Sequence, residues 1–478
     1  MALWNLLKKK TNETVTLNNA LTFKSTESKV LDLFSMGGAL RTRTPEEIEK
    51  FISQALAEDK TLAIKCLFYI RDCRGGQGER RTFREALKIL SNYYPKETEK
   101  VLKLIPEFGR WDDLFYLDNI SIEEIIKEQI KLDIATETPS LLAKWLPSGN
   151  SSSKKSKELA RKVRRYLGYS SKNYRKLLTQ LRTKIKIVET QMSKGDWKKI
   201  NYERVPAKAS MIYKESFKKH DEKGYTKYLE SVEKGEKKIN ASTLFPYEIV
   251  RQAKEKDNKT LDLLWKNLPD YTKGDEKGIV VADVSGSMAG LPINISVSLA
   301  MYFAERNKGI FKNKFITFSS EPELQEVTGA TLNQKIRNLE SAHWNMNTDL
   351  QKVFDLILDT AVDNQVKEVD MPKTIYIISD MEFDEATSDN KKTNFKIIKQ
   401  KYKEAGYELP ILVFWNVDSK QNNTPVTKET DGVLLISGSS PSVFKMVMKR
   451  TTPYDFMLSV LNSDRYKKID ELLNGKAR

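Results

Sequence analysis

The chain has 478 residues and carries 81 Lys and Arg against 65 Asp and Glu, which gives a formal net charge of +16. Hydrophobic residues make up 39% and aromatic residues 9%, enough to build cores for about two to four domains. The sequence contains no apolar run of the roughly 18 residues that a membrane span needs. Its two cysteines argue against a secreted disulfide scaffold. We therefore expect a cytoplasmic protein with no membrane partner.

The excess positive charge lies in the N-terminal part of the chain. Residues 1–274 contain 55 Lys and Arg and 37 Asp and Glu, whereas residues 275–478 contain 26 and 28. Residues 151–200 alone contain 16 basic and 3 acidic residues. This uneven distribution predicts two domains, of which only the first meets a polyanion.

Residues 1–270 show the hydrophobic spacing of helices, as in Ile48, Ile52 and Leu56. Thr44 precedes a proline and two acidic residues, so we expect it to cap the helix that follows. Some ten helices of roughly 10–18 residues are expected in this part of the chain. The pattern predicts an α-helical domain over residues 1–270, arranged as an array of helical pairs and not as a single bundle. A polar segment at 271–277 is the predicted linker.

From residue 278 onward, short apolar runs alternate with helical stretches. This alternation is typical of a doubly wound α/β domain, with a parallel sheet covered by helices on both faces, here over residues 278–478. Such sheets hold ligands at the carboxyl ends of their strands. Strands are expected at 278–282, 314–318, 374–379, 410–415 and 432–436, and helices at 291–307, from 350 onward, at 393–405 and at 441–448.

Three loops at the carboxyl ends of predicted strands carry oxygen-bearing side chains. Asp283, Ser285 and Ser287 form a D-x-S-x-S string after the first strand, Thr348 opens a helix, and Asp380 ends the third strand. Each of these residues is also a common loop or helix cap. Their occurrence together on one sheet favours a site for a hard divalent cation such as Mg²⁺, because that ion prefers oxygen ligands.

This arrangement resembles the metal-ion-dependent adhesion site of von Willebrand factor A domains. The resemblance implies that the two serines and the threonine bind the cation and that the two aspartates act directly or through water. It also implies an open position on the cation for the carboxylate of a protein partner. The neighbouring Glu382, Asp384 and Glu385 are expected to form a solvated acidic loop.

The basic segment has the composition of a nucleic-acid-binding surface. Its Lys and Arg residues recur at helical spacing, and tyrosines are interleaved with them. Lys and Arg would neutralise phosphates, and the tyrosines would stack on unpaired bases. The alternative is a solvated helix face whose tyrosines point into a core. The expected contacts are Arg161, Arg164, Arg165, Lys172, Tyr174, Arg175, Lys176, Arg182 and Lys184.

The order of the motifs resembles the TROVE module of Ro autoantigen-type proteins, and still more an uncharacterised family of plants and phages with the same two-part layout. The motifs are a glycine-rich turn at 72–81, a helix that contains Tyr174, Arg175 and Lys176, and the terminal A-type domain. The resemblance implies a ring or horseshoe of HEAT-like helical pairs that the A-domain closes. It also implies RNA as the partner, either as single-stranded ends or as a structured small RNA. The turn itself lacks the preceding strand and the following Lys-Ser/Thr of a phosphate cradle.

No catalytic constellation emerges from the sequence. The two histidines, His220 and His343, have no nucleophile partner nearby in the sequence, and neither a nucleophile elbow nor a Walker pattern occurs. The sequence predicts a non-catalytic RNA-binding scaffold with a Mg²⁺-dependent interaction site on the A-domain. The alternative hypothesis is a metal-dependent protein-interaction or virion-assembly module without a physiological RNA.

Overall fold

The computed structural model describes residues 11–185, 187–272, 277–318, 321–340, 348–385, 392–447 and 449–475. The predicted combination of a helical N-terminal region and a C-terminal α/β sheet is confirmed in outline. The compact units, however, do not divide at the predicted boundary near residue 270. Met1–Thr82 and Leu244–Lys468 make up unit 1, and Phe83–Thr243 and Ile469–Arg478 make up unit 2. The sheet therefore shares its unit with helices from both ends of the predicted helical domain.

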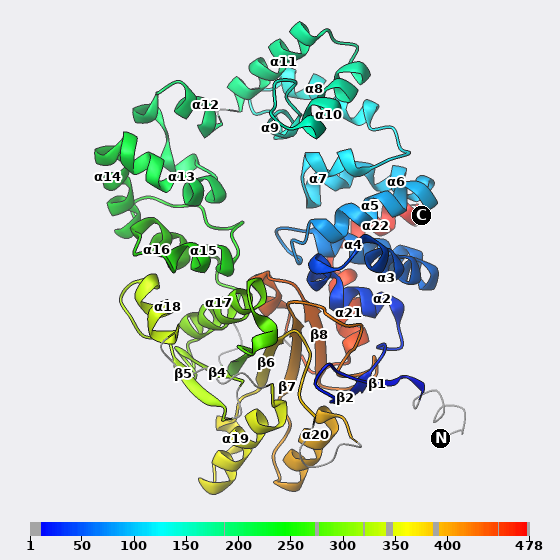
Figure 1. The fold of residues 1–478 in the computed structure, drawn as a ribbon, viewed down its shortest axis with the longest axis vertical. Coiled ribbons are helices and arrows are strands. Elements are labelled where there is room, and N and C mark those ends of the chain that lie inside the picture. Colours follow the sequence, from blue (N-terminus) through cyan, green and yellow to red (C-terminus); the bar gives the residue numbers. More distant parts are fainter. Residues whose placement is uncertain are drawn as a thin grey trace. The chain divides into compact units, whose positions relative to one another are not determined.

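Unit 1 contains a six-stranded sheet with the strand order β5-β4-β3-β6-β7-β8 (Figure 1). Five of the strands are parallel, as predicted, whereas β5 pairs antiparallel with β4 and was not predicted. In the β3–β6 register, Ala282 lies opposite Ile378, so the loops that follow these two strands are neighbours. The strands are β3 (Gly278–Ala282), β4 (Lys314–Thr317), β5 (Glu323–Glu326), β6 (Thr374–Ser379), β7 (Ile411–Asn416) and β8 (Val433–Ser437).

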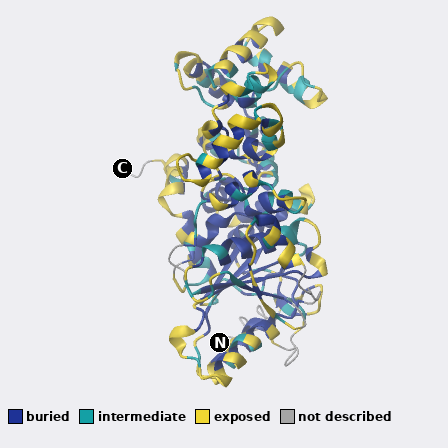
Figure 2. Ribbon diagram, turned by 90° about the vertical axis from the view of Figure 1, so that its left-hand side faces the viewer, coloured by how far each residue is buried: buried dark blue, intermediate teal, exposed yellow. Residues whose placement is uncertain are grey.

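Helices cover both faces of this sheet, and Figure 2 shows its strands mostly buried. Ile377 and Phe414 on one face belong to the apolar cluster that includes residues of α19 and α20. On the opposite face, the rings of Tyr376 and Trp415 contact Phe444 of η8. The helices of unit 1 are α2 (Lys29–Met36), η1 (Gly37–Thr42), α3 (Pro45–Glu58), α4 (Lys60–Arg71), α15 (Pro246–Ala253), α16 (Lys259–Lys266), η6 (Gly286–Met288), α17 (Leu291–Arg306), α18 (Leu332–Glu340), α19 (Leu350–Asp363), η7 (Glu368–Asp370), α20 (Asn394–Glu404), η8 (Pro441–Met446) and α21 (Pro453–Leu461).

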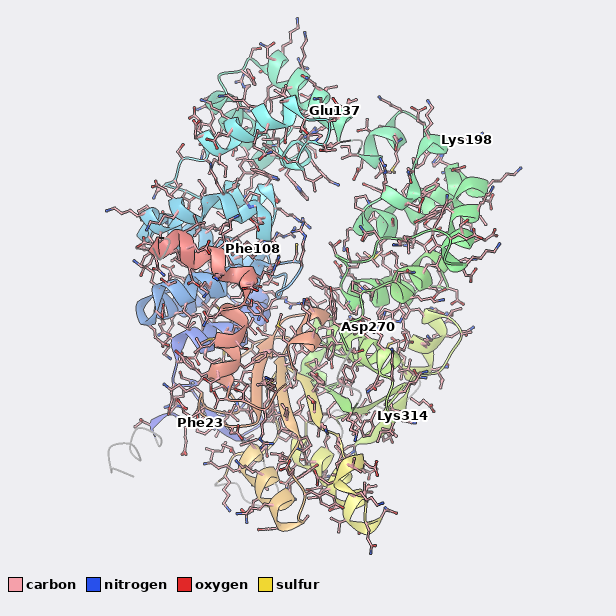
Figure 3. All side chains as sticks on the ribbon, turned by 180° about the vertical axis from the view of Figure 1, so that it is seen from behind. Phe23, Phe108, Glu137, Lys198, Asp270 and Lys314 are labelled. Atoms are coloured by element: carbon pink, nitrogen blue, oxygen red, sulfur yellow. The ribbon has the colours of Figure 1, made fainter. Side chains whose placement is uncertain are left out.

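An N-terminal hairpin of β1 (Glu13–Val15) and β2 (Leu21–Phe23) lies in the part of the chain that was expected to be helical. Phe23, labelled in Figure 3, exchanges backbone hydrogen bonds with Thr424 in the segment after β7. Asn19 forms a bridge to Asp384, which follows β6. The hairpin is therefore attached to the carboxyl edge of the sheet.

The glycine-rich turn after α4 packs against the end of β8. Gln77 is only 1% exposed, and its side-chain amide donates to Ser437 Oγ at 2.9 Å. Gly38 of η1 packs against the same end of β8. A Cβ atom on Gly38 would lie 2.8 Å from the Cα of Gly438, which is closer than real Cβ atoms approach. The turn thus has a packing role. The predicted cap at Thr44 is confirmed, because its hydroxyl accepts from the backbone N–H at the third position of α3.

Unit 2 contains helices and no strands among its described residues. It carries 37 Lys and Arg against 24 Asp and Glu, whereas unit 1 carries 44 against 41. The positive charge of the chain is thus concentrated in unit 2. Its helices are α6 (Pro95–Val101), η2 (Leu102–Leu104), α7 (Ile105–Phe108), η3 (Trp111–Tyr116), α8 (Glu123–Ala135), α9 (Leu142–Trp145), α10 (Lys154–Tyr166), α11 (Ser171–Lys184), α12 (Val188–Ser193), η4 (Trp197–Lys199), η5 (Tyr202–Arg204), α13 (Ala207–His220) and α14 (Glu222–Glu233); α5 (Arg81–Tyr93) and α22 (Asp464–Asn474) each begin in unit 1 and end in unit 2.

Two further predictions bear on the fold. The predicted linker at 271–277 falls largely on residues 273–276, which lie outside the described residues. In the described ranges, no helix has both the length and the apolar character that crossing a membrane requires.

Candidate metal centre and basic surface

Asp283 follows β3 directly and is fully buried. Its Oδ1 accepts a hydrogen bond from the backbone N–H of Ser285 at 2.9 Å, and its Oδ2 accepts one from Ser379 Oγ at 2.6 Å. Burial, together with the nearby carboxylate of Asp380, raises the pKa of Asp283 to about 6. Asp380 is also buried, and a cation placed beside the two carboxylates would stabilise their charged forms.

The two serines connect Asp283 to Asp380. Ser285 Oγ lies 3.1 Å from Ser287 Oγ, which donates to Asp380 Oδ2 at 2.7 Å. The structure thus brings four of the five predicted ligands into one hydrogen-bonded cluster. The atoms that these side chains offer to a metal are all oxygens, which are the ligands that Mg²⁺ prefers. Among the described residues, no three His, Cys, Asp or Glu side chains are grouped to hold a metal, so a cation here depends on the serine hydroxyls.

Thr348 borders this cluster but belongs to a neighbouring group. Its Oγ1 lies 2.9 Å from Asp384 Oδ1 and accepts a hydrogen bond from the side-chain amide of Asn18 at 3.0 Å. Glu382 connects the two groups, because its carbonyl lies 3.2 Å from Thr348 Oγ1 and its N–H donates to Asp380 Oδ1 at 3.2 Å. The Thr348 hydroxyl is therefore engaged by partners other than the four clustered ligands.

The acidic residues after β6 do not form the solvated loop that the sequence predicts. Glu382 is 1% exposed, accepts from the backbone N–H of Leu17 at 2.6 Å, and has a pKa raised by burial. Asp384 is half-buried against Thr348, and of the three acids only Glu385 is exposed. The prediction was wrong because the N-terminal hairpin, more than 350 residues away in sequence, covers this loop.

Lys420 is a cation at this site that sequence reasoning missed. Its ammonium donates to Asp380 Oδ2 at 2.9 Å and also to the backbone carbonyl of Ser287. The Asp380 side chain is fully buried, and the Lys420 side chain is 29% exposed. No local pattern marks Lys420, because only the pairing of β6 with β7 brings the segment after β7 to Asp380.

The basic surface of unit 2 lies on α10 and α11. Residues 154–184 contain 12 Lys and Arg and a single acidic residue, Glu158. Arg164 is half-buried and donates to Ser171 Oγ at 2.8 Å. A shallow hollow of about 480 Å³ is lined by Lys172, Arg175, Lys176, Thr179 and Gln180. The exposed predicted contacts, hereafter the basic surface, are Arg161, Arg165, Lys172, Arg175 and Lys176.

Tyr174 and Lys184 support the fold of unit 2 instead of extending this surface. Tyr174 is 2% exposed, and its hydroxyl donates to the carbonyl of Pro147 at 2.9 Å, so its ring cannot stack on a base. The Lys184 ammonium donates to the carbonyls of Ile134 at 2.6 Å and Thr136 at 3.1 Å. These carbonyls lie at the end of α8, where backbone acceptors lack helical partners.

Arg182 has the same structural role at the end of α9. Its guanidinium donates to the carbonyls of Ala143 at 2.9 Å and Leu146 at 2.8 Å, and to Ser148 Oγ at 2.9 Å. Burial lowers its pKa. All three guanidinium nitrogens thus donate to the protein itself, and this structural role differs from the predicted contact with nucleic acid.

The two histidines stand apart from both sites. The ring of His220 stacks on Trp197 with a centroid separation of 4.3 Å, which is a packing contact. His343 lies outside the described residues, as does the loop at 341–347 that precedes Thr348.

The comparison with protein families covers both halves of the chain. The domain of unknown function DUF2828 matches residues 16–117 and 129–277, together more than half of the sequence. The chain belongs to the DUF2828 family. A second domain of unknown function, DUF7788, matches residues 277–469. The two matches meet where the helical pattern gives way to the sheet.

Individual proteins resemble this DUF2828 protein along most of its length. An uncharacterised protein of Acanthamoeba polyphaga mimivirus is 28% identical over 505 residues, covering 94% of this chain and 87% of the viral protein. The crystal structure of the Ro (RSR) protein of Deinococcus radiodurans aligns with 88% of this chain and 99% of that one, with 12% identity and a TM-score of 0.36. A structural likeness this weak transfers no function, so the functional argument rests on the sites.

Proposed function

We propose that this protein is a non-catalytic RNA-binding scaffold that holds RNA through the basic surface of α10 and α11. The observation that supports the proposal is the charge of these two helices, because residues 154–184 contain twelve Lys and Arg and a single Glu. Exposed Lys and Arg that contact phosphates release condensed counterions, and this release supplies affinity without reading sequence. The choice of RNA over DNA rests on the sequence resemblance to Ro-type proteins.

The structure narrows the expected mode of binding. Of the tyrosines interleaved with the basic residues, Tyr174 is buried, whereas Tyr169 in the turn between α10 and α11 is 37% exposed. One exposed ring offers little stacking area, so phosphate contacts dominate the interaction. We therefore expect binding that tolerates many sequences and weakens steeply with salt.

The test measures the affinity of the full chain for a fluorescent single-stranded RNA over a series of salt concentrations. In the variant, Arg161, Lys172, Arg175 and Lys176 become Gln. Log affinity falls with log salt, and each lost phosphate contact makes this negative slope less steep by about 0.7. Losing four contacts therefore reduces the steepness by about 3 and weakens binding a few hundred-fold at 0.1 M salt. The affinity for a single-stranded DNA of the same sequence, measured in parallel, tests whether the protein prefers RNA.

The matched control changes four exposed lysines of the same unit, Lys218, Lys219, Lys223 and Lys227, to Gln. This control removes the same positive charge from α13 and α14. Unchanged RNA affinity and salt slope in the α10–α11 variant, or an equal loss in the control, would contradict the proposed surface.

For the sheet of unit 1 we propose a von Willebrand A-type domain whose cluster binds Mg²⁺. Ser285, Ser287 and Asp380 would hold the ion, and Asp283 would fix the loop through its bonds to Ser285 N–H and Ser379. A bound Mg²⁺ keeps exchangeable positions, one of which suits the carboxylate of a protein partner. The support is the clustering of four oxygen-bearing side chains, two serine hydroxyls and two buried carboxylates.

Calorimetric titration with Mg²⁺ tests this centre. The Ser285→Ala variant should lose Mg²⁺ binding and keep its melting temperature in EDTA, because a single hydroxyl at the rim of the sheet is removed. Equal Mg²⁺ affinity in wild type and Ser285→Ala would contradict the proposed site.

A further inference from the structure

A hollow of about 510 Å³ lies beside the candidate metal centre in unit 1. Segments of the N-terminal hairpin, α2, α3 and the loop after β7 line it, so distant parts of the chain converge there. Its lining is strongly basic, with a single carboxylate from Asp32. The cationic lining residues are Lys24, Lys29, Arg43, Lys50 and Lys420.

The single lining carboxylate is already saturated by the protein. Asp32 Oδ1 accepts from the backbone N–H and the hydroxyl of Thr26, both at 2.7 Å, and its Oδ2 accepts from Ser25 Oγ at 2.6 Å and Lys29 Nζ at 3.1 Å. Lys24 and Lys50 are exposed at the hollow, and neither forms an ion pair with Asp32. Lys24 Nζ donates to the backbone carbonyl of Thr11 at 3.0 Å, which is a neutral partner. Their charges therefore remain available to a ligand.

The arginine of the hollow has a different role. The Arg43 guanidinium donates to the carbonyl of Ser419 at 2.8 Å, to the side chain of Asn422 at 2.7 Å and to Glu47 at 2.5 Å. These contacts fix the loop that carries Lys420 against the start of α3. The walls of the hollow are thus held in place by bonds within the protein, which lowers the ordering cost of binding a ligand.

Lys420 belongs to both sites. It lines the hollow, and its ammonium donates to Asp380 Oδ2 at 2.9 Å in the candidate metal centre. A divalent cation bound to Asp380 would repel this ammonium strongly, because both positive charges would share one buried carboxylate. The flexible four-carbon stem of lysine lets the ammonium turn away from Asp380 into the hollow that it already lines.

We propose that the hollow binds an oxyanion of the phosphate type and that Lys420 joins this anion when a divalent cation takes its place at Asp380. The phosphate would be either a free ion or the terminal phosphate of a nucleotide. Cation and anion then bind cooperatively, because each favours the same position of Lys420. The anion site stands independently of the metal, whereas the coupling rests on the Mg²⁺ centre proposed above.

The anion site is tested with inorganic phosphate on the full chain in EDTA, by calorimetry. Lys24→Gln with Lys50→Gln should weaken phosphate binding tenfold or more. The control, Lys399→Gln with Lys403→Gln, removes the same charge from exposed positions on α20 that do not line the hollow. Tighter binding of AMP than of phosphate would identify a nucleotide as the source. Equal phosphate affinity in wild type and the Lys24/Lys50 variant would overturn the site.

The coupling is tested by Mg²⁺ titrations with and without saturating phosphate, against blanks that account for magnesium phosphate pairing. Phosphate should tighten Mg²⁺ binding to the wild type several-fold. Lys420→Met should bind Mg²⁺ more tightly than the wild type without phosphate and lose the effect of phosphate. Mg²⁺ affinities that neither phosphate nor Lys420→Met changes would overturn the shared role of Lys420. An absence of Mg²⁺ binding in every protein would instead reject the metal centre and leave the phosphate result standing.

Discussion

Arg175 and Arg182 lie two turns apart on α11, and the structure gives them opposite roles. Arg175 is exposed on the basic surface, whereas the Arg182 guanidinium makes three hydrogen bonds to the end of α9 and the loop after it. Hydrogen bonds to a charged group contribute roughly 1.5–3 kcal/mol each when one partner is removed. Because Arg182 is only half-buried, water replaces part of the loss, and we expect Arg182→Gln to destabilise unit 2 by about 2–4 kcal/mol.

Urea and thermal unfolding followed by circular dichroism measure this loss. For a unit of this size, about 2–4 kcal/mol corresponds to a fall in melting temperature of roughly 5–15 °C. Arg175→Gln should change stability by no more than about 0.5 kcal/mol. It should, however, weaken RNA binding about fivefold at 0.1 M salt, through one lost phosphate contact. Arg182→Gln, measured below its melting transition, should keep the wild-type RNA affinity and salt slope. The reverse pattern would refute the structural role that we assign to Arg182.

Three further predictions concern unit 1. Asp72→Asn should cost about 2–4 kcal/mol in urea unfolding, because the buried carboxylate accepts two hydrogen bonds from the Arg465 guanidinium and one from the Tyr466 hydroxyl, and the substitution removes its ion pair with Arg465; a wild-type midpoint would contradict this. Gly38→Ala should lower stability by about 1–3 kcal/mol, whereas Gly149→Ala, whose added Cβ meets no atom within 4 Å, should have almost no effect. Because the pKa of Asp283 is raised to about 6, its protonated form stabilises the fold at low pH, and this stability is lost as the pH rises from about 4 to 6. In EDTA, Asp283→Asn should remove that pH dependence and exceed the wild type at pH 7 by up to about 3 kcal/mol, and an unchanged dependence would exclude Asp283 as its source.

The sheet was largely predictable because its central strands are continuous apolar runs. Thr374–Ser379 is buried at every position and matches the predicted strand. β5 reads Glu-Leu-Gln-Glu and buries only Gln325, so an edge strand of this kind gives no hydrophobic signal. Asp283 and Asp380 could be placed together because carboxyl ends of adjacent parallel strands meet. Lys420 could not, since it lies four residues beyond the end of β7 in a polar segment, where nothing distinguishes it from the other lysines of the chain.

The basic helices show what periodicity leaves open. Spacing alone predicts a charged face, but the phase of the apolar residues decides which side chains lie on it. Tyr174 shares its phase with Leu177, Leu178 and Leu181, and all four are buried. This i, i+3, i+4, i+7 pattern could have identified the tyrosine as a core residue. The roles of Arg182 and Lys184 could not be found in this way, because their partners are the ends of other helices.

The divided unit 1 has a consequence for synthesis on the ribosome. α2 packs against β8, yet it emerges about 400 residues earlier, which at 5–20 residues per second is roughly 20–80 s. In this interval Val30, Leu33 and Phe34, fully buried in the finished protein, must wait for the sheet that completes their surroundings. Nearly all of unit 2 is synthesised between the two segments of unit 1. Its residues have therefore left the ribosome long before those of unit 1 are complete. A chain released before β8 therefore leaves the apolar side chains of α2 exposed to solvent, and exposed apolar surface of this kind promotes aggregation.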